Sequence, residues 1–115
     1  MTGRVLIVDD HPRMAAVIGM LLRADGRFEI VHSASTAEQG LRLIDGDVDV
    51  VILDLHLPDG RGFELVQRFA SRGVPLVLHS AVEAPDLGDA KGLAVAVVRK
   101  GDTPSLLNAL AATLA

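Results

Sequence analysis

The sequence predicts an α/β fold in which a parallel sheet carries helices on both of its faces. Short runs rich in Val, Leu and Ile alternate with segments of helical periodicity, and these runs contain few polar residues. Parallel strands that are covered on both faces have this composition. Right-handed crossovers place the connecting helices on the two sides of the sheet, so we expect five strand–helix units in a doubly wound arrangement.

Four apolar runs predict the central strands, and a weaker run predicts a fifth. The four are Val5–Val8, Val48–Leu53, Val74–Leu78 and Val95–Val98. The weaker run, FEIVHSA from Phe28, lies between the first two. All five have the length of ordinary strands, about five residues.

Apolar residues at helical spacing predict the first two helices. The first has an apolar face formed by Met14, Val17, Ile18, Leu21 and Leu22. Pro12 before this face suits a first helical turn. In the second helix, Ser35 and Glu38 have the spacing of a capping box ahead of Leu41 and Ile44.

The later helices are less uniform. Leu65, Val66 and Phe69 predict a third helix, and Thr103 before Pro104 opens the last one. The apolar stripe of the last helix is Leu107, Leu110, Ala111 and Leu114. Between residues 80 and 95, Pro85, Gly88 and Gly92 interrupt the pattern, so a helix there is expected to be short or frayed.

Composition limits the class of protein. The 115 residues suit a single domain, 1–115. Lys and Arg total 11 against 15 Asp and Glu, and the only aromatic residues are three Phe, so we expect no direct nucleic-acid binding. The chain has no Cys, which fits a reducing compartment. Its apolar runs are too short for a signal peptide or a membrane span, which favours a soluble cytoplasmic protein without a membrane partner.

The residues that close the predicted strands are the candidate functional site, because ligands bind at the carboxyl ends of parallel strands. The runs are followed by Asp9 and Asp10, by Asp54, by His79 and Ser80, and by Arg99 and Lys100. Neighbouring carboxylates at ~4 Å repel by roughly 4 kcal/mol per pair at an effective dielectric near 20, so they need a cation or a proton. Oxygen ligands favour a hard ion such as Mg²⁺.

These groups suit phosphoryl transfer. Asp54 can act as the nucleophile, while Mg²⁺ and Lys100 neutralise the charge that develops on the phosphoryl oxygens. Ser80 can donate a hydrogen bond to one of those oxygens. The chain has only two lysines, Lys91 and Lys100, and nine arginines. A lysine after the last strand therefore indicates that this position requires a compact point charge.

Four pieces of sequence carry a resemblance to a known family. They are the pair Asp9–Asp10, the block DLHLPDGRG from Asp54, the pair Ser80–Ala81, and Lys100. In order and spacing they resemble the receiver domain of bacterial two-component response regulators, over the whole chain. The resemblance implies a flavodoxin-like sheet of strand order 2-1-3-4-5. It also implies a phosphorylation-dependent signalling switch, which is not an enzyme in the usual sense although it catalyses its own phosphorylation and dephosphorylation.

The resemblance further implies a role for each matching residue. Asp54 would be the phosphoacceptor and Ser80 the switch hydroxyl. Asp10 and Asp54 would bind Mg²⁺ directly, Asp9 would assist, and the backbone carbonyl of His56 would be a further ligand. The phosphoryl donor would be a sensor histidine kinase, and phosphorylation could produce a homodimer. The form DLxLPDGxG resembles the subclass usually fused to a helix-turn-helix DNA-binding output domain, which would lie outside this chain.

Two positions depart from the family pattern. Val97 stands where the family often has an aromatic residue, and Gly101 stands where it often has proline. Val97 is β-branched and stiff at χ1, so it has little freedom to act as a rotamer switch. We therefore expect the phosphorylation signal to be transmitted mainly through ordering of residues 81–92.

Four other interpretations stay open at this point. The aspartates could simply cap helices after the strands. His11, His56 and His79 could bind zinc, although their spacing fits no zinc motif. A phosphohydrolase of the haloacid-dehalogenase type shares the Asp nucleophile, but this class requires a second Asp at the position that His56 occupies. A pseudo-receiver would keep the fold for protein contacts and would have abandoned phosphorylation.

Overall fold

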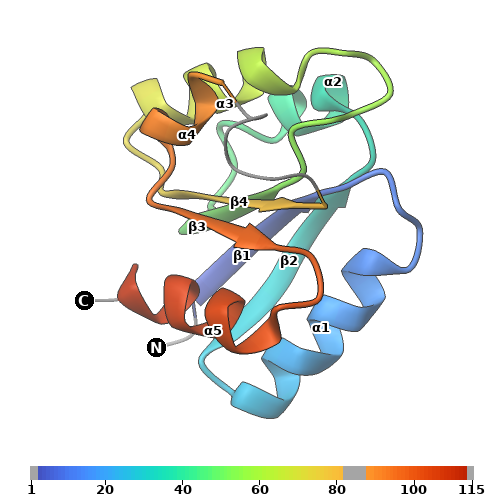
Figure 1. The fold of residues 1–115 in the computed structure, drawn as a ribbon, viewed down its shortest axis with the longest axis vertical. Helices are drawn as coiled ribbons and strands as arrows, with labels where there is room; N and C mark the ends of the chain where they lie inside the picture. The colour runs from blue at the N-terminus through green and yellow to red at the C-terminus, as the bar shows by residue number, and fades with distance from the viewer. Residues whose placement is uncertain (1–2, 82–87, 114–115) are drawn as a thin grey trace.

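The structure is a computed structural model that describes residues 3–81 and 88–113, and it contains one parallel five-stranded sheet of order β2-β1-β3-β4-β5 (Figure 1). The strands are β1 (Gly3–Val8), β2 (Phe28–Ala34), β3 (Val50–Leu53), β4 (Leu76–Ser80) and β5 (Ala96–Arg99). The helices are α1 (Met14–Asp25), α2 (Ala37–Arg42), α3 (Gly62–Ser71), α4 (Ala90–Leu93) and α5 (Thr103–Ala112). The predicted architecture and strand order are confirmed.

The sheet separates two apolar layers. Helices α2, α3 and α4 cover one face, and α1 and α5 cover the other (Figure 1). Along β1, Leu6 and Val8 pack into the first layer, whereas Val5 and Ile7 pack into the second. Successive strand side chains point to opposite faces. Both faces are covered, which is why the strand sequences are apolar without alternation.

Three strands begin later than the sequence pattern predicts. β3 begins at Val50 instead of Val48, β4 at Leu76 instead of Val74, and β5 at Ala96 instead of Val95. The N–H of Val74 donates to the carbonyl of Phe69 at 3.1 Å, so this residue completes the turn after α3. β4 also continues to Ser80, which brings two polar residues into the strand.

The predicted cap of the second helix is wrong by one residue. Thr36 is the N-cap, and its Oγ1 accepts from the N–H of Gln39 at 3.1 Å. Ser35 instead donates from its backbone N–H to Gln39 Oε1 at 2.8 Å. The helix ends at Arg42, so Ile44 packs into the core from the following turn.

The faces of α1 and α5 also differ from the prediction. Pro12 lies in the turn before α1, whose N-cap is Arg13, and not in the first helical turn. Val17, expected in the buried face of α1, is 51% exposed. In α5 the buried residues are Leu106 and Leu110. The predicted stripe omits Leu106, and its last member, residue 114, lies outside the described residues.

The interrupted segment forms only a short helix where it is described. α4 has four residues, which agrees with the expectation for the part after residue 87. Residues 82–87, including the proline that interrupts the pattern, lie outside the described residues, so the expected ordering of 81–92 stays a prediction. Among the described residues, no helix combines the length and the apolar character that crossing a membrane requires.

Candidate functional site

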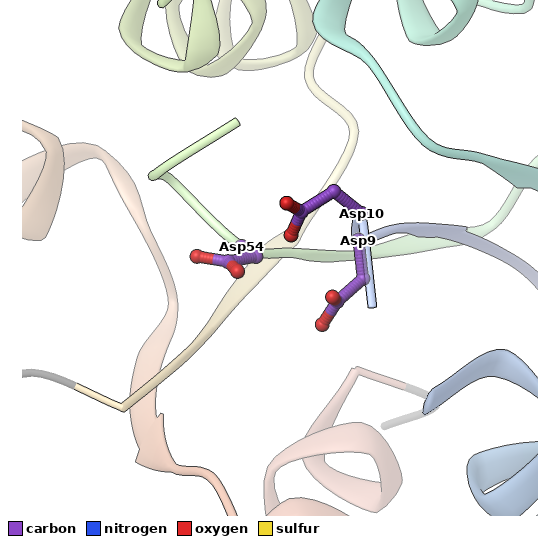
Figure 2. Close-up of side chains that lie close together, drawn as sticks. All are labelled: Asp9, Asp10 and Asp54. Atoms are coloured by element: carbon purple, nitrogen blue, oxygen red, sulfur yellow. The ribbon is translucent and has the colours of Figure 1, made fainter. Parts of the chain in front are cut away.

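Three aspartates meet at the carboxyl ends of β1 and β3 (Figure 2). Val8 and Leu53 are paired in the sheet, so the residues that follow them, Asp9 and Asp54, emerge side by side. Carboxylate oxygens of Asp9, Asp10 and Asp54 lie within 4.8 Å of one another. Asp9 and Asp54 are 9% and 8% exposed, whereas Asp10 is exposed. The structure therefore brings together the three carboxylates that the sequence pattern assigns to one sheet edge.

Two of these carboxylates are oriented by the turns that follow them. Asp9 Oδ1 accepts from the N–H of His11 at 2.8 Å, and Asp54 Oδ1 accepts from the N–H of His56 at 3.1 Å. The helices after these turns have Arg13 and Arg61 as N-caps, and neither helix has a side-chain cap. The interpretation of the aspartates as helix caps is therefore wrong.

Lys100 places a positive charge against the aspartates. Its Nζ lies 2.9 Å from Asp9 Oδ2 and donates to Asp54 Oδ2 at 3.0 Å. The backbone N–H of Lys100 donates to the carbonyl of Ser80 at 2.9 Å, which fixes the start of its loop against β4. Burial lowers the pKa of Lys100, but the hydrogen bonds with Asp9 and Asp54 outweigh it, so the net pKa is raised. The side chain is therefore an ammonium.

The last residues of β4 enter different layers. Ser80 is 1% exposed and belongs to the same sheet edge as the aspartates. His79, 3% exposed, points to the other side, where it lines a cavity between α1 and α5. Burial first, and then the charge of Lys100, lowers the pKa of the His79 imidazole. The sequence identifies His79 only as a strand-ending polar residue and gives no sign of its burial in this layer.

The predicted block from Asp54 onwards contains structural residues as well as candidate ligands. The Asp59 carboxylate accepts from the N–H groups of Ala37 at 3.3 Å and Glu38 at 3.0 Å, so it caps α2 from a distant loop. The hydrogen bond from Glu38 is the main cause of a lowered Asp59 pKa. A Cβ on Gly62 would lie 2.0 Å from the Leu55 carbonyl oxygen, so only glycine fits there.

His56 is placed beside the aspartates but not as an imidazole ligand. It is exposed, and together with Asp10 it lines a hollow of about 370 Å³ outside the sheet edge. Within residues 3–81 and 88–113, the three aspartates are the only group of three or more His, Cys, Asp or Glu side chains close enough to hold one metal ion. The zinc interpretation finds no site among these described residues.

Residues 5–109 match the family model of the response regulator receiver domain. The chain belongs to this family. The receiver is 33% identical over 89 residues to the positive transcription regulator BvgA of Bordetella pertussis. This match covers 76% of the chain and 42% of BvgA. It is 35% identical over 82 residues to the protein-glutamate methylesterase/protein-glutamine glutaminase of Agrobacterium fabrum. That match covers 70% of the chain and 23% of the relative. The match thus spans less than half of each relative.

Solved structures share the fold of the receiver. A LuxR-family two-component response regulator from Aurantimonas superposes with a TM-score of 0.86 at 24% identity, over 99% of this chain and 86% of that chain. The response regulator TrrA of Thermotoga maritima, solved with Mg²⁺ and beryllofluoride, gives 0.86 at 24% identity, over 97% and 99%. The relative BvgA is a transcription regulator, which agrees with the subclass that the sequence indicates.

Proposed function

We propose that this receiver is a signalling switch in which Asp54 accepts a phosphoryl group from the phosphorylated histidine of a sensor kinase. The observation that carries the proposal is the contact of Lys100 with two carboxylates, Asp9 and Asp54, beside a third. A hard cation, a lysine ammonium and a nucleophilic carboxylate are the groups that phosphoryl transfer to Asp requires. The proposal assigns Asp54, Ser80 and Lys100 to the transfer.

The residues at this edge fit a magnesium ion. All donors are oxygen atoms, and three carboxylates that face one another need positive charge beyond a single lysine. Asp10 and Asp54 would hold the ion directly with the backbone carbonyl of His56. Asp9 would assist, because one of its oxygens is already in contact with Lys100 and the other with the N–H of His11. When bound, the ion neutralises charge on the transferred phosphoryl oxygens.

The chain's own residues then perform the transfer. An Asp54 oxygen forms a bond to phosphorus while the phosphorus–nitrogen bond of the phosphohistidine breaks, and the leaving imidazole keeps the electron pair. Lys100, which donates to Asp54 Oδ2 in the unphosphorylated protein, is within reach of a phosphoryl oxygen on the same carboxylate. Ser80 at the end of β4 would donate to another phosphoryl oxygen.

The proposal includes partners outside the chain. The phosphoryl donor is a sensor histidine kinase, and the output runs through a helix-turn-helix DNA-binding domain, as the likeness to the transcription regulator BvgA supports. Homodimerisation on phosphorylation belongs to the same proposal. A phosphohydrolase of the haloacid-dehalogenase type is disfavoured, because its second Asp would stand where the exposed His56 side chain lies.

Acetyl phosphate and Mg²⁺ test the proposal. Intact-mass measurement should show one phosphoryl addition that is lost on treatment with hydroxylamine, as expected for an acyl phosphate and not for phosphoserine. Asp54→Asn should abolish the addition, while Asp89→Asn, an exposed aspartate without a side-chain capping bond, should keep it. Addition to Asp54→Asn at the wild-type rate would refute the assignment. No addition to a wild-type protein that binds Mg²⁺ would instead identify a pseudo-receiver.

A further inference from the structure

An exposed carboxylate joins the loop after Asp54 to a helix that lies much earlier in the chain. Asp59 belongs to the loop between β3 and α3, and its Oδ2 accepts from the N–H of Glu38 at 3.0 Å. Its Oδ1 accepts from the N–H of Ala37 at 3.3 Å. Both N–H groups belong to the first turn of α2. The carboxylate therefore connects two segments that come from opposite sides of β3 in the sequence.

Capping of α2 does not by itself account for this contact. The helix has an N-cap of its own, Thr36, whose Oγ1 accepts from the N–H of Gln39 at 3.1 Å. Glu38 is exposed, and water satisfies free N–H groups at exposed helix ends. What Asp59 adds is a fixed position of the loop relative to α2.

The loop that Asp59 holds is short and internally bonded. The N–H of Leu57 donates to the carbonyl of Leu55 at 3.1 Å, and the N–H of Gly60 donates to the carbonyl of Leu57 at 3.0 Å. Pro58, directly before Asp59, has its backbone φ fixed by its ring. Leu57 is 6% exposed and packs into the layer of α2 and α3. The loop is therefore held at Leu57 by packing and at Asp59 by hydrogen bonds.

His56 is the residue next to these two anchors that belongs to the acidic site. Its N–H donates to Asp54 Oδ1 at 3.1 Å, whereas its side chain is exposed. We propose that Asp59 is a positioning residue of this site, which holds the backbone of His56 in place by joining the loop to α2. The inference rests on the proposed function, in which the carbonyl of His56 would bind Mg²⁺.

Backbone geometry explains why a distant carboxylate matters to such a ligand. A carbonyl oxygen has no side-chain torsion with which to adjust, so its direction depends on the orientation of a planar peptide group. A loop that moves relative to α2 rotates that peptide group. Residues that orient metal ligands in this indirect way typically change metal affinity by roughly 10- to 100-fold when they are replaced.

Two substitutions at the same end of α2 test the proposal, with all variants shown to be folded by circular dichroism. Asp59→Ala removes the contact with the loop, whereas Thr36→Ala removes the helix's own cap and leaves the loop contact in place. Calorimetry should show about tenfold weaker Mg²⁺ binding for Asp59→Ala and unchanged binding for Thr36→Ala. Asp59→Asn keeps one carbonyl oxygen as an acceptor, so its affinity should lie between those of the wild type and Asp59→Ala.

A second measurement needs no metal. Hydrogen exchange at the His56 amide of the metal-free chain should be about fivefold faster in Asp59→Ala, the factor for one net hydrogen bond. The same amide should exchange at the wild-type rate in Thr36→Ala. This measurement separates the position of the loop from the chemistry of the bound ion.

Two results would overturn the proposal. The first is wild-type Mg²⁺ affinity together with wild-type exchange at His56 in Asp59→Ala. The second is an equal loss in Asp59→Ala and Thr36→Ala, which would assign the effect to the stability of α2. A wild-type chain that binds no Mg²⁺ would instead refute the proposed function, and the exchange rates alone would then decide the role of Asp59. If Asp59→Ala fails to fold, Asp59→Asn is compared with Thr36→Ala by the same criteria.

Discussion

Lys100 Nζ lies 2.9 Å from Asp9 Oδ2 and 3.0 Å from Asp54 Oδ2, so one ammonium bridges carboxylates that follow two different strands. Asp10 belongs to the same cluster but has no such contact with Lys100 within the described part of the chain. The charge of the unphosphorylated site is therefore only partly balanced by the protein. A metal ion and Lys100 would both neutralise the negative charge of the three carboxylates.

Replacing Lys100 by Met should destabilise the metal-free protein by about 3 kcal/mol, because two nearly buried carboxylates lose their counter-charge. Urea unfolding in the presence of a chelator measures the effect. Saturating Mg²⁺ should recover part of the loss. Lys91→Met, which removes an exposed lysine, is the control and should change the free energy of unfolding by less than about 0.5 kcal/mol. Equal effects of the two substitutions would contradict the bridging role.

Asp10→Asn should weaken Mg²⁺ binding more than Asp9→Asn does. The oxygens of Asp9 are engaged by Lys100 and by the N–H of His11, whereas Asp10 is exposed and free to turn toward an ion. Calorimetry should show a loss of at least about tenfold in affinity for Asp10→Asn, since it removes a direct ligand. Unchanged affinity in that variant would exclude the proposed metal site.

Gly62→Ala should destabilise the fold by about 3 kcal/mol. The new Cβ would lie 2.0 Å from the Leu55 carbonyl oxygen, and a backbone atom cannot move aside as a side chain can. Because Leu55 follows Asp54, the phosphorylation rate should fall as well. Gly92→Ala is the matched control, since nothing lies within 4 Å of its added Cβ and alanine favours the helix. Similar urea midpoints for the two variants would show that the loop adapts to the side chain.

The stability of the metal-free protein should fall when the pH drops below about 6.5, and His79 should account for part of the fall. Burial lowers the pKa of this imidazole from 6.5, so the unfolded chain takes up the proton first. The stability is complete above the unfolded pKa and declines by at most about 1.4 kcal/mol per pH unit below it. Urea unfolding at several pH values should show a smaller decline for His79→Leu. His32→Gln, at an exposed strand position, should decline like the wild type. The same acid loss in His79→Leu as in the wild type would rule out this role.

The sequence is sufficient for features that depend on strand pattern. Apolar runs such as Val5–Val8 predict a sheet covered on both faces, and the rule that parallel strands share one carboxyl edge is enough to bring Asp9, Asp10 and Asp54 together. The same rule predicts that Lys100, which comes after the last strand, lies beside these aspartates. These predictions need only the direction of the strands and not the packing of individual side chains.

Features that depend on distant partners escape the sequence pattern. Ser35 and Thr36 can both cap a helix, and the choice depends on the end of β2, which ladder pairing fixes at Ala34 opposite Val8. Asp59 belongs to the block that begins at Asp54, yet its carboxylate accepts from N–H groups of α2 more than 20 residues earlier. The burial of His79 likewise follows from the packing of α1 and α5, which no local pattern near β4 indicates.

His79 and Ser80 are consecutive residues whose side chains enter opposite layers of the molecule, so a shift of one peptide unit in β4 displaces both. Thermodynamic reciprocity applies to two structural changes that share this strand. If phosphorylation of Asp54 shifts the packing of His79 between α1 and α5, a change in that packing must shift the equilibrium of phosphorylation by the same free energy. A substitution in the layer of α1 and α5 would then alter the extent of phosphorylation without contacting the phosphoryl group.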